Sequence, residues 1–202
     1  MTKALRIGGF ISGAILVAFG VVVIVLAINA HSTVTDSLKD EKIVGSADMN
    51  PSDIEAAMKE AGLSGVDVPS CDVADEEIDT GSEARCFAEY MRIHALEASG
   101  GLTYAEMGRF ATENGDAKGT NDAEQAAKDD QGQPVSNSAR NLWVTETALS
   151  TALNVSYMAE QLSLFSLVVG IALLLAGVGF IVLAYAAMRP PPPEAANSPA
   201  AA

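Results

Sequence analysis

The sequence is poor in the residues that build catalytic and metal sites. Its 202 residues include two histidines and two cysteines, and aromatic residues make up 5% of the chain. The histidines, His31 and His94, are too far apart to form the spaced ligand set of a non-haem iron site. The sequence also has no GxSxG turn, phosphate-binding loop or dinucleotide-binding fingerprint. We therefore expect no enzyme activity, no cofactor and no metal.

Charged residues are absent from two long stretches. No Asp, Glu, Lys or Arg occurs in residues 7–30 or 161–188, although the whole chain has a formal net charge of −14. A helix rises about 1.5 Å per residue, so roughly 20 residues cross a hydrocarbon core of about 30 Å. We predict two transmembrane helices, at 7–30 and 161–188. Because ionisable groups inside the membrane mark ion and proton paths, their absence argues against a transporter or channel.

The basic residues indicate the orientation of these spans. Lys3, Arg6 and Arg189 flank them, whereas residues 31–160 hold 9 basic and 25 acidic residues, a net of −16. The positive-inside rule places residues 1–6 and 189–202 in the cytoplasm. We therefore expect a cell-membrane protein with both termini cytoplasmic and an acidic extracytoplasmic domain at 31–160. Its charge favours a basic protein partner and disfavours nucleic acid.

A cleaved signal peptide is an alternative interpretation of the first span. Lys3 and Arg6 would then form the basic n-region, with cleavage after Ala30. The apolar run is longer than the usual h-region of about 7–15 residues. We therefore predict a retained transmembrane helix.

Local signals predict a mainly α fold for the domain between the spans. Asn50 caps a helix that should end at Gly62, and Thr80 opens another that should reach about Ala98. Thr103 has capping-box spacing to Glu106, and it should open a short helix through Phe110.

Two segments of the chain have compositions that do not favour a packed core. Residues 113–137 are polar and nearly free of large apolar side chains, so we predict a mobile loop there. The Pro/Ala-rich residues 189–202 should form a disordered tail.

A long helical pattern lies between these two segments, since neither Gly nor Pro interrupts the chain from Ser138 to Gly170. The second span should therefore be continuous with a long external helix, on which Leu142, Leu149 and Leu153 lie toward one side.

Cys71 and Cys86 are expected to form a disulfide, since both lie in the predicted external domain. The bridge would close a loop of about 15 residues, which corresponds to roughly 3 kcal/mol in the chain-entropy model. Two free thiols or a metal-binding pair are the alternatives. Between the cysteines lies an acidic cluster, for which the sequence leaves cation binding undecided: Asp72, Asp75, Glu76, Glu77 and Asp79.

Glycines mark the predicted packing faces of the two spans. Gly9 and Gly13 form a GxxxG pattern, and Gly170 and Gly177 lie in the second span. Small residues let membrane helices approach closely. These glycines are expected to pack the spans either on each other or onto a larger membrane complex.

Residues 93–106 and 138–154, together with the two spans, resemble a family of small actinobacterial membrane proteins. Its members often carry the label aromatic ring-opening dioxygenase, LigA. The resemblance supplies no catalytic residues, and the metal triad that the label implies is missing. Two-span proteins of similar design occur as accessory subunits of actinobacterial cytochrome supercomplexes, which is an analogy of architecture.

We expect a non-enzymatic accessory or scaffolding subunit of a cell-envelope membrane complex, for which a respiratory complex is one example. Its partners would be integral membrane proteins, and a homo-oligomer is also compatible with the sequence. The side chains expected to make partner contacts are His94, Tyr104 and Trp143. One alternative is the ring-opening dioxygenase, with iron bound by His31 and His94. The other is an envelope sensor or ligand-binding module.

Overall fold

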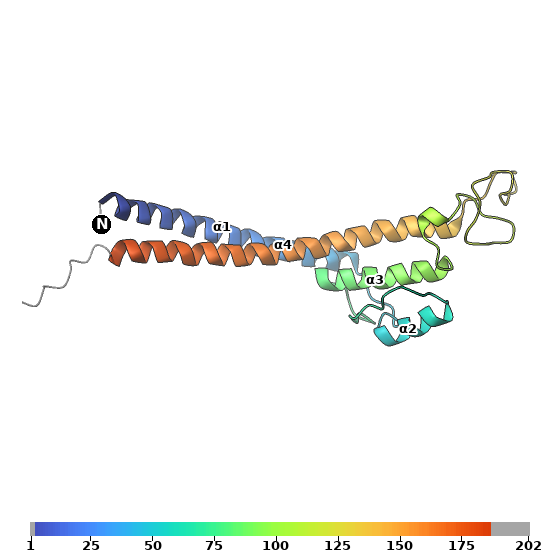
Figure 1. Cartoon of the computed structure of the whole chain (residues 1–202), viewed down its shortest axis with the longest axis horizontal. Coiled ribbons are helices and arrows are strands. Elements are labelled where there is room, and N and C mark those ends of the chain that lie inside the picture. Colours follow the sequence, from blue (N-terminus) through green and yellow to red (C-terminus); the bar gives the residue numbers. More distant parts are fainter. Residues whose placement is uncertain (1–2, 187–202) are drawn as a thin grey trace, which may run out of the picture. The chain divides into compact units, whose positions relative to one another are not determined.

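The chain is mainly helical, as predicted. The computed structural model describes residues 3–186 (Figure 1). Within these residues it contains isolated β-bridges but no strand. The elements in chain order are α1 (Lys3–Glu41), α2 (Pro51–Glu60), α3 (Gly81–Ala98), the 3-10 helix η1 (Tyr104–Glu106) and α4 (Ser138–Ala186). The predicted tail at 189–202 lies outside the described residues.

The described residues divide into two compact units. The first comprises residues 3–30 and 162–186, and the second comprises residues 31–161. Both α1 and α4 are long and apolar enough to cross a membrane, and only 17% of the most apolar 18-residue window of each is buried. The core helix of a soluble protein would be mostly buried, whereas here Phe19 and Phe165 are 61% and 65% exposed. The large apolar side chains of the first unit thus face outward.

Glycines bring the backbones of α1 and α4 together in the first unit. A Cβ atom added to Gly13 would lie 2.7 Å from the carbonyl oxygen of Gly177. One added to Gly20 would lie 2.8 Å from the carbonyl oxygen of Gly170. Since the partner number falls as the α1 number rises, the two helices run antiparallel. Neither close approach has room for a side chain.

These contacts repeat every seven residues and form what we call the small-residue seam. Beyond the glycine pairs, the Ser163 hydroxyl donates a 2.8 Å hydrogen bond to the carbonyl oxygen of Ala27. Gly9 also contacts the seam, since a Cβ there would lie 3.1 Å from the Cβ of Ala184. A strict seven-residue repeat keeps one stripe facing a partner helix with left-handed winding. The seam members are Gly13, Gly20 and Ala27 on α1, and Ser163, Gly170, Gly177 and Ala184 on α4.

The second unit has a conventional hydrophobic core around α3. Tyr90 of α3 is fully buried, and its hydroxyl donates a 2.6 Å hydrogen bond to the carbonyl oxygen of Cys71. Leu38 of α1 and Leu153 of α4 belong to the same buried cluster. The core is completed by side chains from α2, α3 and their connections: Met49, Ile54, Met58, Val73, Ile78, Ala84, Cys86, Ala88 and Ile93.

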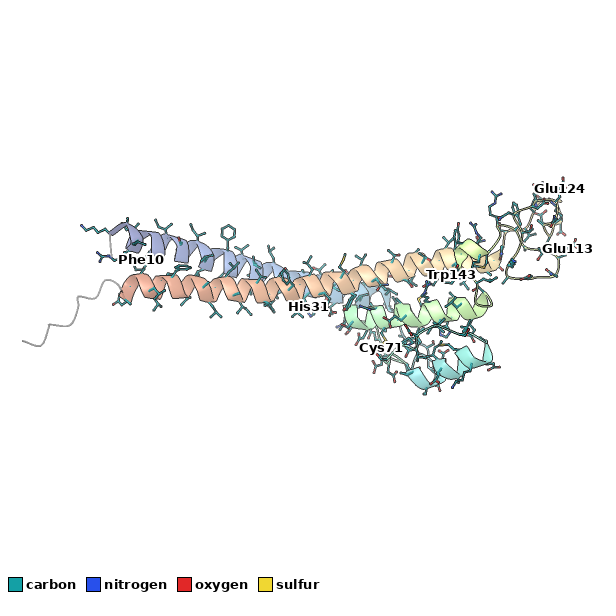
Figure 2. All side chains as sticks on the ribbon, in the orientation of Figure 1. Phe10, His31, Cys71, Glu113, Glu124 and Trp143 are labelled. Atoms are coloured by element: carbon teal, nitrogen blue, oxygen red, sulfur yellow. A yellow bond between two sulfur atoms is a disulfide. The ribbon has the colours of Figure 1, made fainter. Side chains whose placement is uncertain are left out.

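The predicted disulfide is present and ties the segment before α3 to α3 itself. Cys71 and Cys86 are joined, with Cα atoms 6.1 Å apart (Figure 2). Two side chains of the acidic cluster between them make polar contacts within the second unit. The Asp72 carboxylate accepts a hydrogen bond from the backbone N–H of Ala74 at 3.0 Å, and Asp79 lies 3.3 Å from the Lys39 ammonium.

Most helix ends follow the predicted caps. The Asn50 side chain accepts from the backbone N–H of Asp53 at 3.0 Å and caps α2. Thr80 and Glu83 form the predicted capping box of α3. Gly81 allows α3 to begin against α4, because a Cβ there would lie 2.8 Å from the Ser156 carbonyl oxygen.

The prediction of a short helix through Phe110 is wrong, because the 3-10 helix η1 ends at Glu106. Phe110 instead pairs with Thr120 and Ser136 through antiparallel β-bridges. Its backbone N–H donates to the Thr120 carbonyl at 2.9 Å, and the Thr120 N–H donates back at 2.9 Å. The chain reaches these partners only after a polar turn, so no local signal marked the pairing.

Residues 113–137, the predicted mobile loop, contain no helix but are held by hydrogen bonds at their base (Figure 2, Glu113 and Glu124). The buried amide of Asn137 donates to the carbonyl oxygens of Gly108 and Ala117, at 3.1 and 2.8 Å. Its oxygen accepts from the N–H of Ala139 at 3.1 Å, at the start of α4. The segment is therefore anchored at its base, and its mobility stays a prediction.

Candidate partner-binding face of α4

Trp143 lies on α4 and holds it against the connection between α3 and η1. The side chain is 3% exposed. Its indole N–H donates to the Leu102 carbonyl oxygen at 2.8 Å and lies 3.2 Å from the Ser99 hydroxyl. The guanidinium carbon of Arg92 stands 5.1 Å from the ring centroid, within cation–π range. Trp143 therefore has a structural role within the second unit.

Tyr104 is the more accessible of the predicted contact residues. It is 43% exposed, and the guanidinium carbon of Arg140 lies 3.9 Å from its ring centroid. Tyr104 and Trp143 line one open groove of about 570 Å³, which we call the upper groove. The other lining residues come from α4: Val144, Thr147, Ala148 and Thr151. The structure therefore brings two of the three candidates together.

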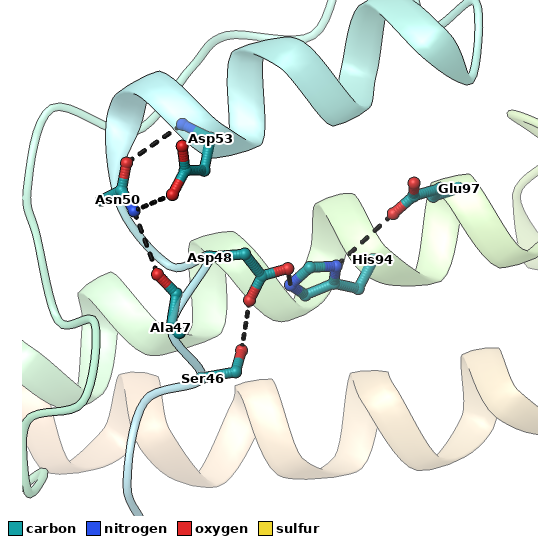
Figure 3. Close-up of polar contacts among 7 residues, drawn as sticks. All are labelled: Ser46, Ala47, Asp48, Asn50, Asp53, His94 and Glu97. Atoms are coloured by element: carbon teal, nitrogen blue, oxygen red, sulfur yellow. Dashed lines mark hydrogen bonds and ion pairs between the residues drawn. The ribbon is translucent and has the colours of Figure 1, made fainter.

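His94 lies in a different contact, on α3 (Figure 3). Its Nε2 is 3.5 Å from an Asp48 carboxylate oxygen, and its Nδ1 is 3.5 Å from a Glu97 carboxylate oxygen. Asp48 also accepts a 2.6 Å hydrogen bond from the Ser46 hydroxyl. His94 of α3 therefore lies close to one carboxylate of the segment before α2 and to one of its own helix.

The surroundings of His94 do not resemble an iron site. Asp48 and Glu97 lie at opposite ring nitrogens, so they cannot both join the imidazole around one ion. A facial triad needs two histidines and one carboxylate on the same ion. Within residues 3–186, no group of three or more His, Cys, Asp or Glu side chains is placed to hold a metal.

A second open groove of about 440 Å³, the α3–α4 groove, lies between these two helices. From α3 it is lined by Ala88, Glu89 and Arg92. The α4 carboxylate in this groove is that of Glu146, which is only 4% exposed. It accepts a 2.7 Å hydrogen bond from the Ser150 hydroxyl. The Glu146 carboxylate is therefore buried and is engaged by a hydroxyl of its own helix.

Along these two grooves α4 presents an apolar strip, which we call the outer face of α4 and whose residues each line one groove or both. Val144, Val155 and Met158 are exposed by 53%, 52% and 63%. Ala148 and Thr151 are also exposed and complete the strip. The spacing alternates between four and three residues, which places all five on one side of a helix. Thr151 lines both grooves, so the grooves border the same face.

The sequence interpretation chose a different side of this helix. It placed Leu142, Leu149 and Leu153 together as an apolar side of α4. Only Leu153 is buried, whereas Leu142 and Leu149 are 42% and 37% exposed. The outer face was missed because two of its five positions are small or polar. The alternating four- and three-residue spacing was the signal that could have found it.

The chain was also compared with known proteins. Neither protein-family models, curated proteins nor solved structures gave a match to this sequence. The function is therefore argued from the residues and their geometry.

Proposed function

We propose that this chain is a non-enzymatic accessory or scaffolding subunit of a cell-envelope membrane complex. The apolar parts of α1 and α4 would be its two membrane spans, with both termini in the cytoplasm. The second unit would lie outside, and α4 would make the second span continuous with an external helix. The distribution of basic residues supports this orientation, since Lys3, Arg6 and Arg189 flank the spans.

The outer face of α4 is the observation that carries this proposal. Exposed apolar side chains are ordinary when scattered, but a continuous strip bordered by grooves is typical of protein contact sites. The strip lies within residues 31–160, which have a net charge of −16. An uncharged apolar strip is therefore unusual on the surface of this region. A docking helix of this kind needs no catalytic group.

Copurification from native membranes in mild detergent tests the proposal. The wild-type chain should emerge with other membrane polypeptides in a fixed ratio. A Val155→Lys variant places a charge within the outer face and should lose these polypeptides. Leu142→Lys is the matched control, because Leu142 is exposed on the same helix outside the outer face. Recovery of the wild-type chain without any other membrane protein would contradict the proposal.

An envelope ligand-binding module is a second candidate. The observation that favours it is the α3–α4 groove, whose lining includes both the buried Glu146 and Arg92. Glu146→Gln should then abolish the thermal stabilisation that a small-molecule library gives to the wild-type chain. If no compound stabilises the wild type, this candidate loses its basis.

The dioxygenase alternative requires iron. It predicts stoichiometric metal in protein purified from iron-supplied cells, and loss of that metal in His94→Ala. The flanking of His94 by single carboxylates on opposite ring nitrogens does not support it. Elemental analysis of the wild type decides this point directly.

A further inference from the structure

We propose that the outer face of α4 binds the same face of a second copy of this chain, so that the protein works as a parallel dimer. This inference rests on the membrane topology of the proposed function and makes the dimer the unit that docks. The outer face would join the two copies, and the other membrane polypeptides would bind the paired chain, so that Val155→Lys would lose them by separating the pair. The two-copy contact would run over Val144, Ala148, Thr151, Val155 and Met158.

The spacing of the outer face is that of a coiled-coil seam. Counting from Val144, the alternating steps of four and three residues match the d and a positions of two heptads. Val155 then occupies an a position, where β-branched residues favour two-stranded parallel pairs. Val144 and Met158 occupy d positions and are exposed by 53% and 63% within one copy. A second helix in this register would cover them.

Membrane insertion would supply the geometry that this register needs. Two copies inserted with the same orientation can be related by a two-fold axis only if that axis lies along the membrane normal. A contact on this axis is isologous, so each residue of α4 meets the same residue of the other copy. Two α4 helices would therefore lie parallel and in register.

Charge favours a second copy over an oppositely charged partner on this face. The flanking e and g positions are all uncharged: Thr145, Ala152 and Ala159 at e, and Thr147, Asn154 and Gln161 at g. Both acidic residues of this stretch of α4 are engaged within their own unit. Glu146 is buried, and Glu160 accepts a 3.1 Å hydrogen bond from the Ser82 hydroxyl. Two charged side chains of α3, Glu89 and Arg92, line the α3–α4 groove next to this face, and both are engaged in their own unit, Glu89 with Arg85 at 3.1 Å and Arg92 over the ring of Trp143. A basic partner would therefore find each neighbouring carboxylate already engaged, whereas the α4 helices of two copies bring no charge into their contact.

The remaining surface of the second unit predicts how salt affects this dimer. Each copy carries a net charge of −16 between residues 31 and 160, so two copies repel each other outside the contact. Salt screens exposed charges beyond about 8 Å at physiological ionic strength. Raising the salt concentration should therefore strengthen the dimer, whereas it would weaken a contact with a basic partner.

Single-cysteine crosslinking in native membranes tests the inference. The chain has no free thiol, because its two cysteines form the disulfide, so each introduced cysteine is the sole reactive one. Val144→Cys and Val155→Cys should each give a disulfide-linked band at twice the 20.9 kDa chain mass, with the yield rising as salt is added. Leu142→Cys is the matched control and should give at least about tenfold less, since it lies outside the contact.

A second substitution separates a specific contact from random collision. Adding Val155→Lys to Val144→Cys should remove the crosslink, whereas adding Leu142→Lys should leave it. Equal crosslinking at Leu142→Cys and Val144→Cys, or its absence from every outer-face position, would overturn the dimer. A crosslink from Val144→Cys to a different polypeptide would also overturn it, although the proposed accessory function would then stand. A dimer that copurifies with no other protein would instead refute the proposed function alone.

Discussion

The two units of this chain are built in opposite ways. In the first, small residues lie inside the helix contact while the large apolar side chains, such as Phe19 and Phe165, face outward. In the second, a large aromatic residue, Tyr90, is fully buried and most charged residues, Glu146 apart, lie at the surface. Burial of apolar surface stabilises a fold only where water is the alternative. The difference teaches that the first unit depends on close packing, whereas the second depends on burial, hydrogen bonds and one disulfide.

Enlarging the seam glycines should break the first unit and leave the second intact. In Gly13→Leu/Gly20→Leu the new Cβ atoms would lie 2.7 and 2.8 Å from backbone oxygens of α4. A backbone oxygen cannot move aside as a flexible side chain can, so the helices should separate. We expect a loss of stability of at least about 1–3 kcal/mol per site. Crosslinking between cysteines introduced at Ala27 and Ser163 measures the separation.

Gly8→Leu and Gly179→Leu are the matched controls for the seam. A Cβ at either position meets nothing within 4 Å. The crosslink yield in these variants should equal that of the parent. If the seam and control variants behaved alike, the close approach of the two helices would not be what holds them together.

Removing the disulfide should destabilise the second unit and leave the helix contact of the first unit intact. Cys71→Ser/Cys86→Ser frees a loop of about 15 residues, so the second unit should lose roughly 3 kcal/mol of unfolding free energy. Denaturant titration followed by Trp143 fluorescence reports on this unit. The Ala27–Ser163 crosslink should not change. A parallel loss of that crosslink would show that the two units do not fold independently.

The smallest expected effect is a pH dependence confined to the second unit. Burial raises the pKa of Tyr90, and the nearby charges of Asp72 and Glu89 add to this effect. Because the folded-state pKa lies above the unfolded value of about 10, the stability from neutral Tyr90 is complete below about pH 10. It is lost as the pH rises through the folded pKa. Chemical denaturation at about pH 8 and pH 10.5 measures the loss.

Tyr90→Phe provides the control for this pH dependence. It should be less stable at neutral pH by about 1–3 kcal/mol, because the Cys71 carbonyl loses its donor. Its further loss of stability between the two pH values should be smaller than that of the wild type. An equal loss in both proteins would assign the pH dependence to other groups.

The parts of this fold that sequence reasoning found are those with local causes. Asn50, Thr80 and Glu83 cap helices through neighbours three residues away, and two cysteines in one domain left a single pairing. The helix of α1 beyond residue 30 was not predicted. Its residues 31–41 carry Val34 and Leu38 as isolated apolar positions, and packing against the core around α3 makes them helical.

The features that were missed or only partly predicted depend on residues far apart in the sequence. Phe110 pairs with Thr120 and Ser136, and a local helix signal cannot reveal partners so far along the chain. The glycine pattern was recognised at Gly9 and Gly13, but the repeat of seven that includes Gly20 became visible only when both helices were compared. Trp143 was predicted as a contact residue, and only the structure shows its hydrogen bond to the Leu102 carbonyl.

Thiol labelling of intact cells tests most directly whether the two units occupy membrane and exterior. A cysteine introduced at the exposed Gln131 of the second unit should react with a membrane-impermeant maleimide before lysis. A cysteine introduced at Thr2 should react only after the membrane is opened. Labelling of Thr2→Cys in intact cells, with protection of Gln131→Cys, would contradict the proposed topology and with it the role of the outer face of α4 outside the membrane.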